Sequence, residues 1–167
     1  MAQKYDAENL LETILGIMKT SGALNTKITA VEDEKIAQSK GLSPALKLVS
    51  DDSYFLQSWN EKILNKSPAI FYGIEDTTAQ SAGSAVLKIY KIFVELVMVD
   101  NGMSNDGSKR IMRYARALEE LFAENFSPAV AQGTVKVEAV RPVAFKLALD
   151  SDEEIKVGGV TLTIGIA

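Results

Sequence analysis

The sequence predicts an α+β fold, with a mainly antiparallel (mixed) sheet and helices packed on one face. Helical spacing of apolar residues marks the beginning and the middle of the chain. Runs rich in Val, Ile, Phe and Tyr follow one another across turns or through one helix, which is typical of α+β proteins. The length of 167 residues suits one domain, so we expect a single domain over residues 1–167.

The first predicted helix covers residues 7–20. Its apolar side chains share one face at helical spacing, and they are Leu10, Leu11, Ile14, Leu15 and Met18. Asp6 is a suitable N-cap because its carboxylate can accept hydrogen bonds from the free amides of the first turn. Ser21-Gly22 is expected to end this helix. Residues 23–50 are predicted to be irregular, with a short helix around residues 33–38.

A second helix is predicted over residues 52–65. The side chains that would share its apolar face are Phe55, Leu56, Trp59, Ile63 and Leu64. Two interpretations of Trp59 and Phe55 are an aromatic binding box and ordinary core packing. Their helical spacing favours core packing.

Two strands are predicted next. Residues 69–74 and 85–99 are rich in β-branched and aromatic side chains, which suit a pleated sheet. The polar residues 75–84 between them predict a loop that is longer than a typical hairpin connection. Asp100-Asn101-Gly102 after the second strand is a turn signal.

A third helix is predicted over residues 106–126. Lys109, Arg110 and Arg113 lie in its first half, and its second half is acidic. This order opposes the helix dipole, which favours acidic residues first and basic residues last. The two interpretations are a contact with a partner and a solvated face, and the solvated face is favoured.

The last part of the chain predicts further strands. Apolar residues occupy the odd positions of 134–149, so we expect one face of this strand to be apolar throughout. Pro142 cannot donate to a ladder and marks an edge, a bulge or a break. Residues 153–166 predict either a hairpin closed by a Gly158-Gly159 turn or one continuous strand with a glycine bulge.

Composition excludes several classes of function. The chain has no cysteine and no histidine, which removes thiol nucleophiles, Ser-His-Asp triads and most transition-metal sites. The net charge of −4 argues against a dedicated nucleic-acid binder. The longest apolar run, 92–99, is far shorter than the roughly 20 residues of a membrane helix. We therefore expect no catalytic residue, no cofactor, no metal and no membrane contact.

Four segments together carry a resemblance to a known family. They are Ser67-Pro-Ala-Ile-Phe-Tyr-Gly-Ile74, the strand run 86–96, the helix run 113–121 with Arg113-Tyr-Ala-Arg-Ala-Leu-Glu-Glu-Leu121, and the closing strands 134–166. In this order of elements the chain resembles the tail terminator (tail completion) proteins of tailed phages and contractile tail-like particles. The resemblance covers residues 67–167 and one helix before them. Residues 22–50 have no counterpart and would be an irregular insertion.

The resemblance implies a tail-terminator-like fold and a structural role without catalysis. Proteins of this family form a homo-hexameric ring that caps the tail tube and joins it to the head connector. The implied partners are further copies of the chain, the tail tube protein and a head connector or neck protein. DNA would pass through the lumen without sequence-specific binding, and the protein would be part of the virion, assembled in the host cytoplasm.

Candidate contact residues follow from this expectation. Lys109, Arg110 and Arg113 are predicted to meet an acidic surface on a neighbour. Thr77, Thr78 and Ser81 lie in the predicted loop 75–84 and are expected to face the lumen or a partner; with the three basic residues they complete the candidate contact set.

Three alternative functions remain open from the sequence. One is a different head–tail neck component. The second is a regulatory domain that binds a small ligand between the sheet and the helices. The third is an enzyme that would use Mg²⁺ held by carboxylates such as Asp150 and Asp152, although the calcium-loop pattern fails at Ile155, where glycine is required.

Overall fold

The computed structural model describes residues 6–60, 65–100, 105–131, 133–146 and 152–166. In these ranges the helices are α1 (Ala7–Lys19), a 3-10 turn η1 (Thr20–Gly22), α2 (Ala23–Ala37), α3 (Asn105–Asn125) and the short α4 (Pro128–Ala131). The strands are β1 (Tyr54–Phe55), β2 (Ala69–Ala82), β3 (Ala85–Asp100), β4 (Thr134–Lys146) and β5 (Glu154–Ile166).

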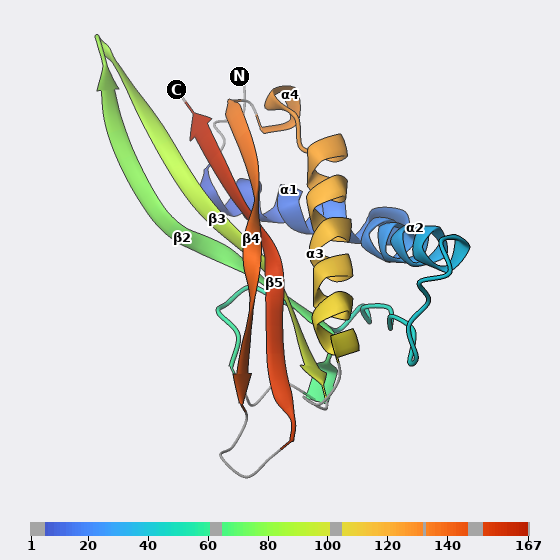
Figure 1. Ribbon diagram of the computed structural model, residues 1–167. Coiled ribbons are helices and arrows are strands. Elements are labelled where there is room, and N and C mark those ends of the chain that lie inside the picture. Colours follow the sequence, from blue (N-terminus) through green and yellow to red (C-terminus); the bar gives the residue numbers. More distant parts are fainter. Residues whose placement is uncertain (1–5, 61–64, 101–104, 132, 147–151, 167) are drawn as a thin grey trace.

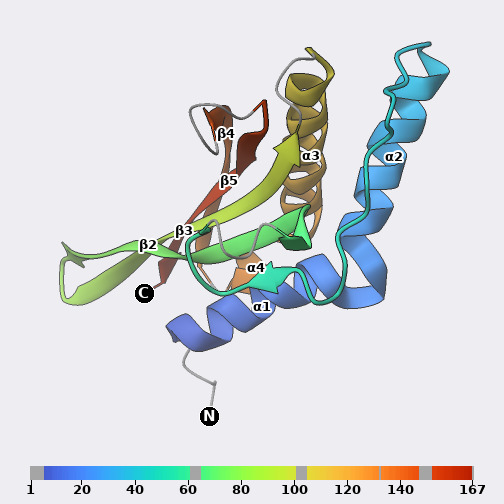
Figure 2. The same ribbon diagram turned by 90° about the horizontal axis from the view of Figure 1, so that it is seen from below.

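The described strands form one sheet in the order β1-β2-β3-β5-β4. The short strand β1 is parallel to β2, and every other neighbouring pair is antiparallel. The long helices cover one face of this sheet, where their apolar side chains join those of the strands in the main core. Figure 2 shows α3 between the sheet and α2. The predicted α+β fold with a mixed sheet and helices on one face is therefore confirmed.

Two helices follow the prediction closely. Helix α1 buries Leu10, Ile14 and Met18, and the Asp6 carboxylate accepts a hydrogen bond from the Asn9 amide at 2.9 Å. This is the predicted N-cap. Helix α3 spans 21 residues and presents its apolar stripe to the sheet.

The prediction of irregular structure over residues 23–50 is wrong for its first half. Residues Ala23–Ala37 form the 15-residue helix α2, not a short helix at 33–38. Ser21 and Gly22 have left-handed φ angles of 54° and 66°, so they redirect the chain between two helices. The acidic run 31–34 obscured the pattern, because Glu32 is buried and pairs with a basic residue of α3.

The predicted helix over residues 52–65 is also wrong. Tyr54 and Phe55 form strand β1 beside β2, residues 56–60 are not helical, and residues 61–64 lie outside the described ranges. Alternation along the strand sends Tyr54 toward the main core and Phe55 to the opposite face of the sheet. Phe55 stacks on Phe71 with ring centroids 5.2 Å apart, and Trp59 lies 5.6 Å from Phe145. These aromatic side chains pack, as the core interpretation expected.

The predicted loop 75–84 is instead a hairpin. Strand β2 continues to Ala82, a tight turn at Gly83 and Ser84 follows, and Ala82 pairs with Ala85 at the start of β3. Gly83 has a φ of 66°, which glycine adopts at little cost. The register of the ladder shifts between Ile74 and Asp76, and pairing then continues to the turn. Polar composition alone suggested a loop, whereas threonine suits a strand.

The bulge at Pro142 is confirmed, because the register of β4 against β5 shifts between Val140 and Val143. The prediction of one apolar face on β4 is wrong for the same reason. Val137 lies beside the main core, while Phe145 lies on the opposite face against Trp59. One extra residue in a strand reverses which side later odd positions face. Residues 147–149 of the prediction lie outside the described ranges.

Strand β5 runs without interruption through Gly158 and Gly159, so the hairpin interpretation of residues 153–166 is wrong. The ladder with β3 shows no register shift there, and the shift in the ladder with β4 comes from the extra residue of β4 opposite Gly158. Gly158 instead lets α3 approach the sheet, because a Cβ at this position would lie 3.0 Å from Ile111 Cγ1. Of the predicted turn at 100–102, residues 101 and 102 lie outside the described ranges.

Candidate assembly surface

The β2–β3 hairpin projects from the body of the molecule as an arm. Figure 1 shows its tip beyond the layer of helices, and Figure 2 shows it directed away from α2 and α3. Residues 75–81 and 83–86 are exposed, and the first buried side chain of β3 is that of Tyr90. We call residues 75–89 the arm. Its two strands are paired from Asp76 to the turn, yet it takes almost no part in the core.

The predicted contact residues Thr77, Thr78 and Ser81 lie on this arm. They are exposed strand residues opposite Tyr90, Ile89 and Val86, and not members of a loop. Their role in a contact stays a prediction. All three side chains lie on strand β2, so the strand fixes the distances between them.

The outer edge of β2 is open along most of its length. Strand β1 pairs only with Ile70 and Phe71, and within the described ranges no strand lies beside Tyr72–Ala82 on that side. An open edge presents unpaired backbone N–H and C=O groups that can bind another strand. The isolated ribbon of an arm has little hydrophobic support of its own. The arm therefore carries exposed backbone groups with which a further strand could pair.

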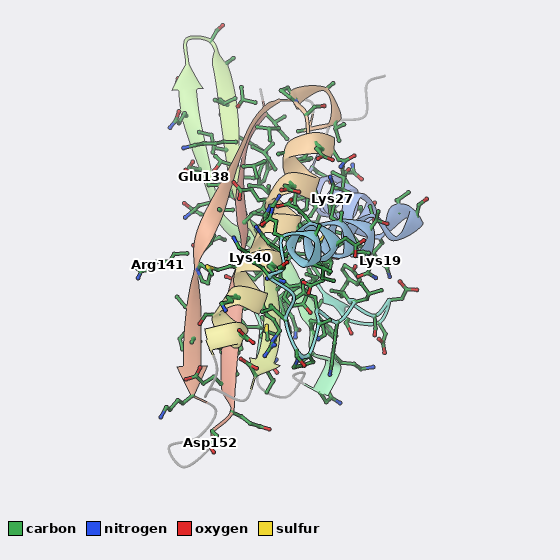
Figure 3. All side chains as sticks on the ribbon, turned by 45° about the vertical axis from the view of Figure 1, so that its right-hand side comes forward. Lys19, Lys27, Lys40, Glu138, Arg141 and Asp152 are labelled. Carbon is green, nitrogen blue, oxygen red and sulfur yellow. The ribbon has the colours of Figure 1, made fainter. Side chains whose placement is uncertain are left out.

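Strand β4 forms the opposite edge of the sheet. It carries exposed apolar side chains near its bulge: Val140 is 37% exposed, and Val143 and Phe145 are 47% exposed. Arg141 points away from the body of the molecule at this edge, as Figure 3 shows. One edge of the sheet is therefore acidic and polar at Glu75 and Asp76, while the other carries apolar groups and charges of both signs, including Lys136 and Glu138.

The basic residues of α3 have partners within the chain. The buried Arg110 guanidinium lies 3.1 Å from Asp100 Oδ1 and donates to the backbone oxygen of Pro44 at 3.1 Å. The buried Arg113 guanidinium lies 2.9 Å from Glu32 Oε2 and donates to the backbone oxygen of Lys40. The solvated-face interpretation is therefore wrong for these two residues.

Lys109 differs from its two neighbours. Its side chain is 53% exposed and pairs with Asp106 at 3.1 Å. The charge order that opposes the helix dipole is explained within the chain, because Arg110 and Arg113 hold the strand end and α2 against α3. Partner contact by the three basic residues stays a prediction, and Lys109 is the exposed member of the set. Their carboxylate partners were not identifiable from spacing, since Glu32 lies 81 residues from Arg113.

An exposed ion pair extends this connection. Arg116 binds both carboxylate oxygens of Glu34, at 3.0 and 2.6 Å, and also contacts Glu120 at 2.6 Å. The hydrogen bonds from Arg116 lower the pKa of Glu34 to about 2. Because the folded-state pKa is depressed, this contact is present above pH 4.5 and is lost as the pH falls toward 2.

The segment 42–49 lies against α3 and α2, and side chains of these helices hydrogen-bond to its backbone at two points. The Tyr114 hydroxyl donates to the backbone oxygen of Lys47 at 2.8 Å and accepts from its amide at 2.9 Å. Asn25 makes the same kind of pair with the backbone of Val49, at 2.9 Å in each direction. Burial raises the pKa of Tyr114 to about 12.

We expect Tyr114→Phe to lower the free energy of unfolding by about 1–2 kcal/mol, because two hydrogen bonds to Lys47 are lost. In the wild type, the contribution of the Tyr114 hydroxyl to the free energy of unfolding is fully present below pH 10. It is lost as the pH rises through 12, because the folded state holds the proton more tightly than the unfolded state. The variant should lose stability less steeply from pH 10 to 12. Burial also raises the pKa of Tyr54 to about 12, and the contribution of Tyr54 to the pH dependence should be the same in wild type and variant. Urea unfolding at several pH values measures both effects, and identical pH slopes would contradict the assignment.

A cavity of about 440 Å³ lies under the segment 42–49. Its lining includes Pro44, Met98, Asp100, Arg110 and Tyr114. This is the place where the small-ligand interpretation would apply. The polar walls of the cavity already bind the chain itself, since Arg110 pairs with Asp100 and Tyr114 binds Lys47. Among the described residues, the cavity therefore has room for a small ligand but few polar groups left to bind one.

Across the described ranges, no three His, Cys, Asp or Glu side chains are placed to hold a metal ion together. Asp150 lies outside those ranges. No described helix combines the length and the apolar character that crossing a bilayer requires. No protein-family model matches the sequence, and no curated protein matches it.

Proposed function

We propose that this chain is a ring-forming structural protein of a phage tail, of the tail terminator kind, which caps the tail tube and joins it to the head connector. The observation that carries the proposal is the exposed β2–β3 arm. An enzyme or a ligand-binding domain has no evident use for a long hairpin that stands outside its core. A protein whose function lies in its contacts does.

The free energy of the arm supports the same conclusion. Ordering each backbone residue costs roughly 1–2 kcal/mol of conformational entropy. The arm residues are mostly exposed, so little burial within the chain offsets this cost. Contact with a neighbouring subunit would supply the missing burial. The arm is thus better explained as part of an assembly than as part of an isolated domain.

Ring closure requires a contact between two different surfaces of the same chain. The chain offers two open sheet edges of different character, at β2 and at β4. In the proposed assembly the partners are further copies of the chain, the tail tube protein and a head connector protein. The ring would be a hexamer in the virion. With a net charge of −4, its lumen would let DNA pass without gripping it.

The experiment compares the full chain with an arm-shortened variant. In this variant Asn-Gly replaces residues 78–89 and joins Thr77 to Tyr90, which are paired across the ladder. We expect the full chain to form a particle of several copies and the variant to remain a monomer. Light scattering after size exclusion measures both masses.

The variant should still fold, because the residues removed contribute little to the core. The single tryptophan, Trp59, packs against Phe145 on the far face of the sheet and gives a near-ultraviolet dichroism signal that reports the native fold. An arm-shortened protein with a native signal and an unchanged oligomer mass would show that the arm has no part in assembly.

A further inference from the structure

We propose that the outer edge of β2 in one copy pairs, antiparallel, with the outer edge of β4 in the next copy, so that the sheet continues from subunit to subunit. This inference rests on the proposed ring and names one contact within it; the rest of the arm, which the arm-shortened variant lacks, would make a further contact. The paired segments are Tyr72–Thr78, at the base of the arm, and Thr134–Ala139. The occupant of each edge is therefore a second copy of this chain.

Within the described ranges both edges are free of a neighbouring strand, and the β2 segment has one irregularity, the bulge between Ile74 and Asp76. On β2, strand β1 blocks the edge only at Ile70 and Phe71, so the free part begins at Tyr72. On β4, the regular ladder ends at Val140, where the bulge begins, and Pro142 has no N–H to donate. Each segment thus has its own natural limit, and a partner strand could not extend past it.

These two limits lie at the same height in the sheet. Following the ladder across the strands, Tyr72 pairs with Val94, Val94 with Val160, and Val160 with Ala139. A neighbour related by rotation about an axis along the strands keeps this height. Its β4 would then meet the free part of β2 and would leave the ladder where β1 begins.

The directions of the strands also agree. Strands β2 and β5 run one way, and β3 and β4 run the other way, because each neighbouring pair from β2 to β4 is antiparallel. A copy related by the same rotation keeps its strand directions. Its β2 therefore meets β4 antiparallel, which is the more stable arrangement for a sheet edge. Had the two edges run in the same direction, ring symmetry would have imposed a parallel pair.

Charge favours the same pairing. The ladder places Asp76 level with Lys136, through Lys91 and Thr163. The Lys136 side chain is 68% exposed and lies 2.8 Å from Glu138 Oε1, which is itself about half exposed. Opposite charges directly across two strands stabilise a sheet, whereas like charges destabilise it. The acidic base of the arm therefore meets a basic group of the neighbouring edge.

Disulfide trapping tests the contact directly, because the chain has no cysteine of its own. Thr78 and Thr134 are at the same height and both are exposed. Within one chain they are separated by β3 and β5, about 14 Å at the usual strand spacing, so an intramolecular disulfide cannot form. Across the proposed contact, the Cα atoms of directly opposite residues would lie about 4.5–5.5 Å apart, which is within the Cα–Cα range of a disulfide.

Thr78→Cys and Thr134→Cys proteins are purified separately, mixed under oxidising conditions and separated on a non-reducing gel. We expect the 78–134 heterodimer to exceed both homodimers by at least tenfold. The control replaces Thr134→Cys with Thr29→Cys, an exposed threonine on α2, which should give only background. Gln80→Cys mixed with Thr134→Cys tests a register moved by two residues.

The outcomes separate this inference from the proposed function. One outcome is a ring-sized mass together with no more heterodimer than in the Thr29→Cys control, whether Thr134→Cys is mixed with Thr78→Cys or with Gln80→Cys. That outcome would overturn the edge pairing and leave the ring intact. Homodimers of Thr78→Cys alone would indicate a two-fold contact and would overturn both. A monomer that gives no trapped product at any concentration would also overturn both. Heterodimer formation supports the pairing, and the better of the two β2 positions gives its register.

Discussion

Glu32→Ala is expected to lower the free energy of unfolding by about 3–5 kcal/mol, the usual effect of removing one partner of a buried ion pair. The Arg113 guanidinium would stay buried without its carboxylate and would keep its hydrogen bond to the backbone oxygen of Lys40. The wild-type pair is already imperfect, since Glu32 Oε1 has no hydrogen-bond partner among the described residues. The pair therefore fixes how α2 lies on α3 at a considerable desolvation cost.

The double variant Glu32→Leu with Arg113→Met is the matched test of this view. Replacing both charges with apolar side chains of similar size is often neutral or stabilising, so the double variant should be much closer to wild type than Glu32→Ala. Glu34→Ala, which breaks the exposed pair with Arg116, should lower stability far less than Glu32→Ala, because water screens an exposed ion pair. Urea unfolding followed by circular dichroism gives the three values. Equal losses for Glu32→Ala and Glu34→Ala would contradict the buried role.

Gly159→Ala is expected to destabilise the chain by about 3 kcal/mol, at the upper end of the usual range for overpacking. A Cβ at this position would lie 2.0 Å from the backbone oxygen of Val94, on the neighbouring strand. A backbone atom in a central ladder cannot move aside as a side chain can. The β3–β5 pairing would have to separate locally.

Gly158→Ala is the matched control, one residue away on the same strand. Its Cβ would lie 3.0 Å from Ile111 Cγ1 and 3.4 Å from Ala115 Cβ, which are side-chain atoms of α3. A small shift of Ile111 accommodates it, so we expect a loss of about 1 kcal/mol. Thermal and urea unfolding of both variants measure the difference. A larger loss for Gly158→Ala would mean that these glycines do not lie within one continuous strand.

Elements with strong local signals could be predicted from the sequence. Helices α1 and α3 have apolar stripes at helical spacing, and β3 is a long run of β-branched and aromatic residues. Pro142 correctly marked the bulge in β4. The side to which residues point after that bulge was not predictable, because one extra residue reverses the alternation.

The errors arose where tertiary contacts override composition. Helix α2 contains a charged residue, Glu32, on its buried side, and only its distant partner Arg113 makes that position favourable. The segment around Trp59 has helical spacing, yet its aromatic side chains pack across the face of a sheet that local sequence does not reveal. Residues 75–84 are polar because they lie in a hairpin outside the core and not because they form a loop.

The candidate contact residues divide in the same way. Thr77, Thr78 and Ser81 were placed in a segment that the structure exposes, although on a strand. Arg110 and Arg113 were selected for a charge order that opposes the helix dipole, and the structure accounts for that order through Asp100 and Glu32. A sequence can show that charges are unusually placed. It cannot show whether their partners lie in the same chain.

Negative-stain electron microscopy of the full chain at high concentration, with its mass measured on the same sample, is the decisive test of the proposed ring. We expect rings with a central hole and a mass of about six copies. In the arm-shortened variant the rings should be absent. A full chain that keeps the mass of one copy at every concentration, with no annular particles, would show that it does not form the proposed ring.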